Sequence, residues 1–276
     1  MADARRAWLA LQRDLGGDEV IFDRPFVPTL DDAPVPPTTA PAVEPTAGPT
    51  PTREWRVKSY PAGQEPEWLA GAPPIPGPGL EVTTPPAMAG GVWPSLEAIA
   101  AEVAGCRKCP LCEGRTNAVP GEGNPRAALM VVGEGPGEQE DLSGRPFVGR
   151  AGELLDKILA AIDLPRPEVY IANVVKCRPP RNRAPLPDER AACMPYLHRQ
   201  IAMVRPRVLL ALGATAAEAL LGVRQTLGSL RLKVHTLDAI PLVVTYHPAA
   251  LLRNPNWKRP AWDDVRIARQ LVDAES

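Results

Sequence analysis

From residue 95 onward, short runs of consecutive apolar residues alternate with longer stretches in which apolar residues recur every three to four positions. A short run that ends at a glycine or a polar residue is typical of a buried strand, and the longer spacing is typical of an amphipathic helix. Strands are predicted at residues 128–133, 169–175, 208–213 and 240–246, the last after a hairpin partner at 230–235. Helices are predicted at residues 150–162, 188–204, 215–222 and along the stripe from Trp262 to Val272. This alternation predicts a three-layer α/β sandwich with a mostly parallel central sheet.

In folds of this class, ligands bind beyond the carboxyl ends of the parallel strands. The sequence therefore directs attention to the residues after Gly133, to residues 173–176, to the turn after Gly213 and to His247. The turn after Gly213 also carries a helix-start signal, because residues 215–218 (Thr-Ala-Ala-Glu) fit a capping box.

Proline divides the chain into two parts. Of its 35 prolines, 18 lie in residues 1–94, and the stretches 28–52 and 71–94 combine Pro, Ala, Thr and Gly with few charges. Such segments bury too little apolar surface to offset the entropy lost when the backbone is ordered. We expect residues 1–94 to be a Pro-rich, largely disordered tail and residues 95–276 to be the folded domain.

Tryptophans mark two apolar patches in this tail, one around Trp8 and one that contains Trp55 and Trp68. They have two interpretations. They are docking motifs for a replication or repair protein, or they are short segments that pack on the domain.

The formal net charge of −1 is the sum of −5 for residues 1–94 and +4 for residues 95–276, which excludes a uniformly basic nucleic-acid coat. No apolar run approaches the ~18 residues that a membrane-spanning helix needs. The N-terminus has neither the core nor the cleavage site of a signal peptide. We expect a monomeric, cytoplasmic protein with no membrane association.

The segment from Gly133 to Gly137 (Gly-Glu-Gly-Pro-Gly) follows the first predicted strand. It is not the dinucleotide-binding fingerprint, because Glu138 stands where the third glycine would be. A glycine-rich turn allows the backbone to approach a ligand closely, and Glu134 brings a carboxylate to the same place. An ordinary tight turn is the alternative.

Three further side chains suit contact with a planar ligand. Phe147 lies in a glycine-flanked loop, where an aromatic ring is a candidate platform for stacking on a base. Asn173 lies in an otherwise apolar strand, and its amide can both donate and accept. His247 follows a strand and precedes a proline, a position suited to hydrogen bonding or charge. Each has a structural alternative, in core packing or in bonding to the backbone.

Five cysteines in a chain without an export signal favour metal or thiol chemistry over a disulfide framework. Cys106, Cys109 and Cys112 are spaced as metal ligands, and Cys177 and Cys193 follow later. Four thiolates suit zinc or an iron–sulfur cluster, and the spacing leaves both open, alongside buried free thiols.

Taken together, the segments from Cys106 to Leu271 resemble the family 4 (iron–sulfur) uracil-DNA glycosylases. The segments that carry the resemblance are CRKC and EGRT (106–116), GEGNP (121–125), GEGPGEQED (133–141), GRPFVGRAGELL (144–155), VYIANVVKCRPPRNRAPLPDE (169–189) and TYHPAALLRNP (245–255). They occur in the family's order over most of the domain. The resemblance does not extend to residues 1–94.

The resemblance implies a structural [4Fe-4S] cluster, with Cys112 spare and with four ligands: Cys106, Cys109, Cys177 and Cys193. It implies a uracil pocket made by Glu134, Gly135, Phe147, Asn173 and His247, with Glu140 helping to exclude the methyl group of thymine. In this pocket Phe147 would stack on the base, Asn173 would read its edge and His247 would bond its carbonyl oxygen. Glu134, Asn173 and His247 would be the catalytic residues.

The implied function is that of a DNA repair enzyme, which flips uracil out of single- or double-stranded DNA and hydrolyses its N-glycosidic bond. An abasic site would remain. Contacts to the phosphates are expected from the basic loop 176–183, with Lys176, Arg178, Arg181 and Arg183. Further contacts are expected from Arg253, Lys258 and Arg259. Leu251 or Leu252 is expected to fill the gap that the flipped base leaves.

Three alternatives remain from the sequence. The covalent uracil-trapping relative carries a reactive histidine in a basic loop, but the corresponding residues 178–189 contain no histidine. A non-catalytic DNA- or polymerase-binding module scaffolded by an iron–sulfur cluster has no reason to retain Glu134, Phe147, Asn173 and His247 together. A zinc-stabilised nucleotide-binding domain is the third.

Overall fold

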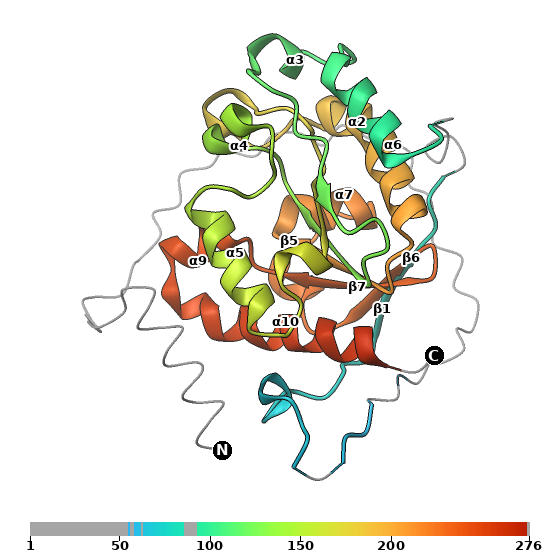
Figure 1. The fold of residues 1–276 in the computed structure, drawn as a ribbon, viewed down its shortest axis with the longest axis vertical. Coiled ribbons are helices and arrows are strands. Elements are labelled where there is room, and N and C mark those ends of the chain that lie inside the picture. Colours follow the sequence, from blue (N-terminus) through green and yellow to red (C-terminus); the bar gives the residue numbers. More distant parts are fainter. Residues whose placement is uncertain (1–54, 56–57, 62, 86–92, 275–276) are drawn as a thin grey trace, which may run out of the picture.

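The structure, a computed structural model, describes residues 55, 58–61, 63–85 and 93–274. These residues form one seven-stranded sheet with the strand order β1-β6-β7-β5-β3-β4-β2. The central pairs β4–β3, β3–β5 and β5–β7 are parallel, as is the outer pair β1–β6. Only β6–β7 and β2–β4 are antiparallel within this sheet. Figure 1 shows the sheet with helices on both sides.

The elements, in chain order within each kind, have the following bounds. The strands are β1 (Pro78–Val82), β2 (Glu122–Gly123), β3 (Leu129–Gly133), β4 (Tyr170–Asn173), β5 (Val208–Leu212), β6 (Val234–Leu237) and β7 (Ile240–Thr245). The α-helices are α2 (Leu96–Gly105), α3 (Leu111–Gly114), α4 (Glu138–Ser143), α5 (Arg150–Ala160), α6 (Pro187–Val204), α7 (Ala214–Leu221), α8 (Leu227–Leu230), α9 (Pro248–Arg253) and α10 (Lys258–Asp273). The 3₁₀ turns are η1 (Glu67–Leu69), η2 (Arg166–Glu168), η3 (Pro180–Asn182) and η4 (Pro255–Trp257).

The central strands are apolar throughout because both of their faces are covered. Alternate residues of β3 point to opposite sides, so Leu129 and Val131 lie in one core cluster while Met130 and Val132 lie in the other. Helices α5, α9 and α10 supply the first cluster, and α6 and α7 supply the second. The predicted three-layer α/β fold with a mostly parallel sheet is therefore confirmed.

Residues 78–82 lie in a stretch that we expected to be linker or disordered, and this expectation is wrong. They form β1, which pairs in parallel with β6 at the edge of the sheet. His235 holds the pairing, because its Nδ1 accepts a hydrogen bond from the Leu80 amide at 2.9 Å. Backbone pairing to an edge strand needs no apolar side chains, which is why composition alone does not reveal it.

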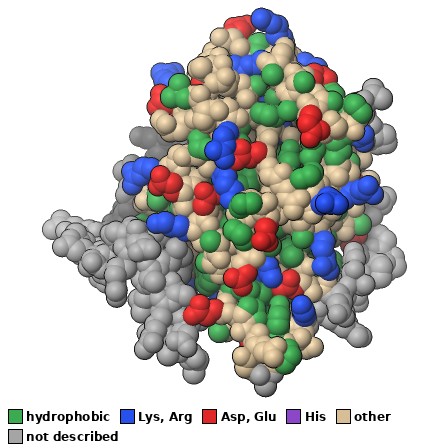
Figure 2. Space-filling view, in the orientation of Figure 1, with side chains coloured by type: hydrophobic (Ala, Val, Ile, Leu, Met, Phe, Trp, Pro, Cys, Tyr) green, Lys and Arg blue, Asp and Glu red, His purple; other side chains and the backbone are tan. Residues whose placement is uncertain are grey.

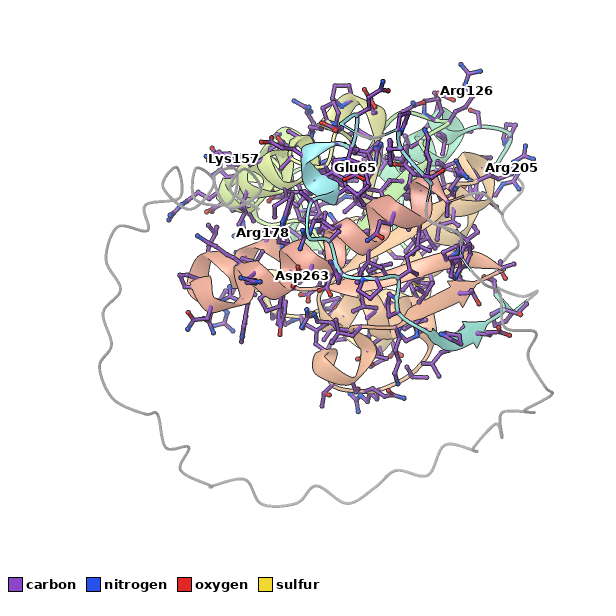
Figure 3. All side chains as sticks on the ribbon, turned by 90° about the horizontal axis from the view of Figure 1, so that it is seen from below. Glu65, Arg126, Lys157, Arg178, Arg205 and Asp263 are labelled. Atoms are coloured by element: carbon purple, nitrogen blue, oxygen red, sulfur yellow. The ribbon has the colours of Figure 1, made fainter. Side chains whose placement is uncertain are left out.

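The patch around Trp68 packs on the domain, which was one of its two interpretations. Trp68 is 3% exposed and lies in the same core cluster as α5 and α10, with Trp55 packed at its margin. The carbonyl oxygens of Ala70 and Pro73 accept hydrogen bonds from Arg266 and Gln270 of α10. Figure 3 shows this segment beside α10, near the labelled Glu65 and Asp263. The patch around Trp8 lies outside the described residues.

The capping box predicted at Thr215 and Glu218 is wrong. Helix α7 begins at Ala214, and Gly213 is its N-cap with φ 88°. Glu218 instead pairs with Arg190 of α6 at 3.1 Å. Gly222 ends the helix in the left-handed conformation, as predicted.

Across the described residues, no helix is long and apolar enough to cross a membrane.

Candidate active site

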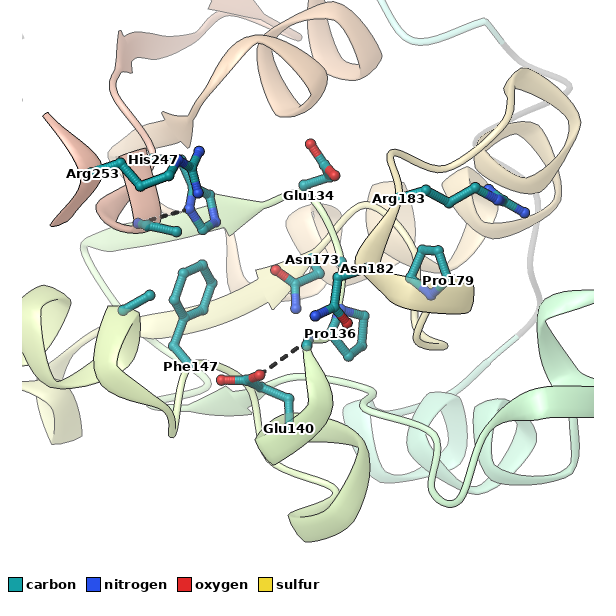
Figure 4. A pocket seen from close by; sticks show the side chains of 14 residues that line it. Glu134, Pro136, Glu140, Phe147, Asn173, Pro179, Asn182, Arg183, His247 and Arg253 are labelled. Carbon is teal, nitrogen blue, oxygen red and sulfur yellow. Dashed lines mark hydrogen bonds between the residues drawn. The ribbon is translucent and has the colours of Figure 1, made fainter. Parts of the chain in front are cut away.

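The carboxyl ends of β3, β4 and β7 meet at one cavity of about 380 Å³. This is within the usual size of a small-molecule pocket. Its walls come from the turn after β3, the loop before α5, the loop after β4 and the start of α9. It is lined by Glu134, Gly135, Pro136, Gly137, Glu140, Phe147, Ala151, Asn173, Pro179, Asn182, Arg183, His247, Ala249 and Arg253 (Figure 4). All the residues that we expected to bind uracil therefore lie around one cavity.

The turn after β3 runs close against the neighbouring strand. A Cβ on Gly135 would lie 2.7 Å from Cγ2 of Val175, so the backbone there has room only for glycine. Glu134 projects from this turn, and its carboxylate makes no hydrogen bond or ion pair within the part of the chain that the structure describes. It is available to water or to a ligand in the cavity.

Asn173 ends β4, opposite Gly133 of β3. It is 1% exposed, and its Oδ1 has no hydrogen-bond partner among the described residues. An unpaired buried acceptor costs about 1–3 kcal/mol unless a ligand satisfies it. Lys176 Nζ donates to the Asn173 main-chain oxygen at 2.8 Å, which fixes the end of the strand.

Phe147 lies in the loop between α4 and α5 with φ 51°, in the left-handed region that non-glycine residues rarely adopt. Its ring and the Asn173 carboxamide both lie against Gly133, where a Cβ would be 2.5 Å from Phe147 Cζ and 2.4 Å from Asn173 Oδ1. The ring centroid is 5.5 Å from that of His247. The aromatic face and the amide therefore converge on the same space.

The carboxylate of Glu140 is occupied by backbone amides. Its Oε1 accepts from Val148 and Gly149 at 2.9 and 3.1 Å, and its Oε2 accepts from Gly137 at 3.0 Å. Glu140 thus ties the turn after β3 to the loop that carries Phe147. The Gly137 bond is local and belongs to the capping box of α4, whereas the bonds from Val148 and Gly149 depend on how the following loop folds back.

His247 is the N-cap of α9, and its Nδ1 accepts from the Ala249 amide at 3.2 Å. Burial lowers the pKa of His247 to about 4, with a smaller lowering from Arg253 and an opposing effect of Glu140. The neutral ring with Nδ1 as acceptor carries its proton on Nε2. The site therefore offers a neutral N–H donor.

Lys176 and Lys258 are buried, so the expectation that they contact phosphates is wrong. The expected arginines at positions 178, 181, 183 and 253 differ in their partners. Arg253 lines the cavity, and neither it nor Arg181 has an ion-pair or hydrogen-bond partner among the described residues. Arg178 donates to Asn182 Oδ1 at 2.8 Å, and Arg183 forms a bidentate pair with Glu189. On the face shown in Figure 2, basic and acidic side chains are interspersed.

Leu251 is 1% exposed and belongs to the core cluster under α5 and α9. The expectation that Leu251 contacts DNA is therefore wrong, because α9 turns this side chain inward. Leu252 is only partly buried against the same cluster.

The five cysteines converge on a second cavity. They line it together with Val103, Lys108, Lys176, Ala192 and Tyr196. The thiols are free, and Arg115 Nη1 lies 3.0 Å from Sγ of Cys177. Segments that are far apart in sequence, from α2–α3, from the loop after β4 and from α6, meet here.

The donor set is all sulfur, which suits either a zinc ion or an iron–sulfur cluster. Among the described residues, no group of three or more His, Cys, Asp or Glu side chains is arranged to hold a metal ion. Burial also raises the pKa of Cys193 to about 11, so a bound cation would be needed to hold thiolates there.

The first cavity, at the carboxyl ends of the parallel strands of an α/β sheet, has a size and a lining that suit one heterocyclic base. The model of the uracil DNA glycosylase superfamily matches residues 120–266. A type-4 uracil-DNA glycosylase of Sulfurisphaera tokodaii is 46% identical over 187 residues, covering 64% of this chain and 85% of the relative.

A type-4 uracil-DNA glycosylase of Thermotoga maritima is 44% identical over 184 residues, covering 65% of this chain and 96% of the relative. A type-5 uracil-DNA glycosylase of Thermus thermophilus is 36% identical over 118 residues, which cover 37% of this chain and 53% of the relative. The chain belongs to the uracil DNA glycosylase superfamily, and within it to the type-4 family.

Proposed function

We propose that this protein removes uracil from DNA by hydrolysing the N-glycosidic bond and leaving an abasic site. One observation carries the proposal: the buried, unpaired Oδ1 of Asn173 lies beside the aromatic ring of Phe147 in a cavity of base size. The carbonyl can accept the N3–H of uracil while the amide donates to O4. Cytosine presents the opposite pattern and would leave buried polar groups unpaired.

His247 is proposed to stabilise the departing base. Glycosidic cleavage places negative charge on uracil and positive charge on the sugar. A neutral Nε2–H aimed at a uracil carbonyl oxygen stabilises that negative charge as an oxyanion-hole donor does. The ring needs no protonation for this role, which agrees with the lowering of its pKa by burial.

Glu134 is proposed to hold the attacking water and to favour the cationic sugar, because its carboxylate lines the cavity without a protein partner among the described residues. Gly135 contributes backbone to the same wall. Phe147 stacks on the flipped base, an interaction that typically contributes about 1–3 kcal/mol. Arg181 and Arg253 contact phosphates, which makes binding sensitive to salt.

We also propose that Cys106, Cys109, Cys177 and Cys193 hold a [4Fe-4S] cluster, and that Cys112 lies beside it. When bound, the cluster would supply cross-linking of three chain segments rather than a step of the reaction. Its connection to the site is through the chain, since Lys176 lines the cysteine cavity and donates to the Asn173 main-chain oxygen.

The test uses end-labelled oligonucleotides with one uracil or one cytosine, in single- and double-stranded form. We expect strand cleavage at uracil only after alkali, with the cytosine oligonucleotide intact. A slowly migrating adduct on a denaturing gel would favour the covalent trapping relative instead. An intact, unshifted strand that the protein nonetheless retains in a native gel would favour a binding module.

A further inference from the structure

The backbone around Phe147 is held in a conformation that it would not adopt alone. A non-glycine residue at φ 51° costs energy, and such residues persist only where the surroundings fix them. Helix α5 packs directly beneath, since a Cβ on Gly152 would lie 1.9 Å from the Phe147 carbonyl oxygen. The position of the ring in the cavity therefore depends on how this loop is held.

Glu140 accepts hydrogen bonds from backbone amides of this loop, and Arg166 donates hydrogen bonds to its backbone carbonyl oxygens. From η2, Arg166 Nη1 donates to the Phe147 oxygen at 3.1 Å, and Nη2 donates to the Pro146 oxygen. The two carbonyls belong to consecutive residues, so one planar guanidinium bonds the backbone on both sides of the Phe147 α-carbon. Arg166 itself does not line the cavity.

Arg166 is in turn fixed by two carboxylates. Its Nε and Nη2 donate to Glu122 Oε1 at 3.1 and 2.8 Å, and its Nη1 donates to Asp156 at 3.0 Å. The side chain is 18% exposed. Arg145 shares Glu122 but is 59% exposed and makes no bond to the loop carbonyls among the described residues.

We propose that Arg166 is a positioning residue for base recognition, which fixes the stacking ring of Phe147 by bonding the two carbonyls before and at that residue. This inference rests on the proposed function, because it deepens the account of the uracil pocket. Lysine cannot take this role, since one ammonium does not span two carbonyls and two carboxylates in a fixed plane. Arg166 acts through Phe147 and does not touch the base.

The test compares Arg166→Lys with the matched control Arg145→Gln, which removes a neighbouring charge but leaves the loop bonds. Asp156→Asn is a milder variant that weakens one anchor of Arg166 by removing its negative charge. The readouts are the single-turnover rate of uracil excision, inhibition by free uracil, the unfolding temperature, and amide hydrogen exchange in residues 144–150.

We expect Arg166→Lys to lower the excision rate and raise the inhibition constant of uracil by about tenfold each, the lower end of what a stacked base contributes. Arg145→Gln should change both by less than about twofold, as ion pairs at the surface contribute little. In a Phe147→Ala background, Arg166→Lys should have little further effect, because the ring through which it acts is gone.

Wild-type excision and inhibition in a folded Arg166→Lys protein would overturn the inference, as would an undiminished effect in the Phe147→Ala background. Hydrogen exchange tests it without any substrate. Exchange at residues 144–150 should rise in Arg166→Lys and Asp156→Asn but not in Arg145→Gln, and unchanged exchange would overturn the inference. If the wild-type protein neither excises uracil nor is inhibited by it, the proposed function fails instead, and the exchange result stands separately.

Discussion

The backbone amide of Ala249 donates a hydrogen bond to Nδ1 of His247, and this contact determines which ring nitrogen carries the proton in the neutral ring. The ring is thereby prepared as an Nε2–H donor before any base arrives. The same contact opposes protonation of the ring, because an N–H on Nδ1 would point at the N–H of Ala249.

The pH dependence of excision should therefore lack the inflection of an ordinary histidine. Burial lowers the pKa of His247 to about 4, so the ring stays neutral well below its usual value of 6.5. We expect single-turnover rates to stay level from about pH 5.5 to pH 8 and to fall only nearer pH 4. A loss centred near the usual value that disappears in His247→Asn would contradict this.

The same shift predicts a change in stability. The folded protein binds this proton more weakly than the unfolded chain, so the free energy of unfolding should drop as the pH falls from about 6.5 towards about 4. Urea titrations of the wild type and His247→Asn over this range measure the difference, which should shrink in the variant.

Asn173→Asp should lower uracil excision by about 10- to 100-fold, since a carboxylate cannot donate to O4 and leaves that pairing unmade. Single-turnover assays on uracil and cytosine oligonucleotides measure it. Asn256→Asp, at an exposed position outside the cavity, controls for the added negative charge. An Asn173→Asp protein with the wild-type rate would remove this side chain from base recognition.

Replacing any one of Cys106, Cys109, Cys177 and Cys193 by alanine should abolish the broad absorbance at about 400 nm that a [4Fe-4S] cluster gives, and should reduce bound iron. Cys112→Ala should retain both, because four thiolates complete the cluster. Loss of iron from Cys112→Ala, with retention in Cys106→Ala, would reverse the assignment. Zinc without a chromophore in the wild type would reject the cluster.

Arg253→Gln should weaken DNA binding equally for all sequences and reduce the slope of log affinity against log salt by about 1. Arg183→Gln should act differently, because Arg183 pairs with the buried Glu189. We expect Arg183→Gln to lower the unfolding temperature and to change the salt slope less than Arg253→Gln does. Binding titrations at several salt concentrations and thermal melts measure both variants. The same unfolding temperature and the same salt slope in the two variants would show that the Glu189 pair is not structural.

Trp68→Ala should lower the free energy of unfolding by about 3–5 kcal/mol, the usual cost of emptying a core position of this size. Leu232, which is 60% exposed, offers a control whose truncation should cost little. Denaturant titrations measure both. An unchanged free energy of unfolding in Trp68→Ala would show that the segment before residue 85 does not stabilise the domain.

Much of the base site was predictable because it depends on local signals. The apolar runs at residues 128–133 and 169–175 identify parallel strands, and parallel strands bring their carboxyl ends together. The second strand ends at Asn173, two residues earlier than predicted. The inward turn of Leu251 depends on which face of the short α9 packs on α5, and no local signal carries that.

Long-range bonds account for the other differences. Three features join segments whose approach only the fold creates: the hydrogen bond from the Gly149 amide to Glu140, the hydrogen bond from Arg166 to the Phe147 carbonyl oxygen, and the pairing of β1 with β6. A signal for Arg166 exists only in hindsight, as an arginine just before the strand that ends at Asn173.

The pairing of β1 with β6 also constrains how the chain reaches its final form. Leu80 bonds to a residue 155 positions later, so β1 leaves the ribosome long before its partner exists. Closing so long a loop is slow, and an unpaired strand is prone to aggregate while it waits. The prolines and glycines around β1 disfavour self-association, so the edge can remain soluble until β6 and β7 are in place. The pairing of β1 is therefore expected to be a late event in folding.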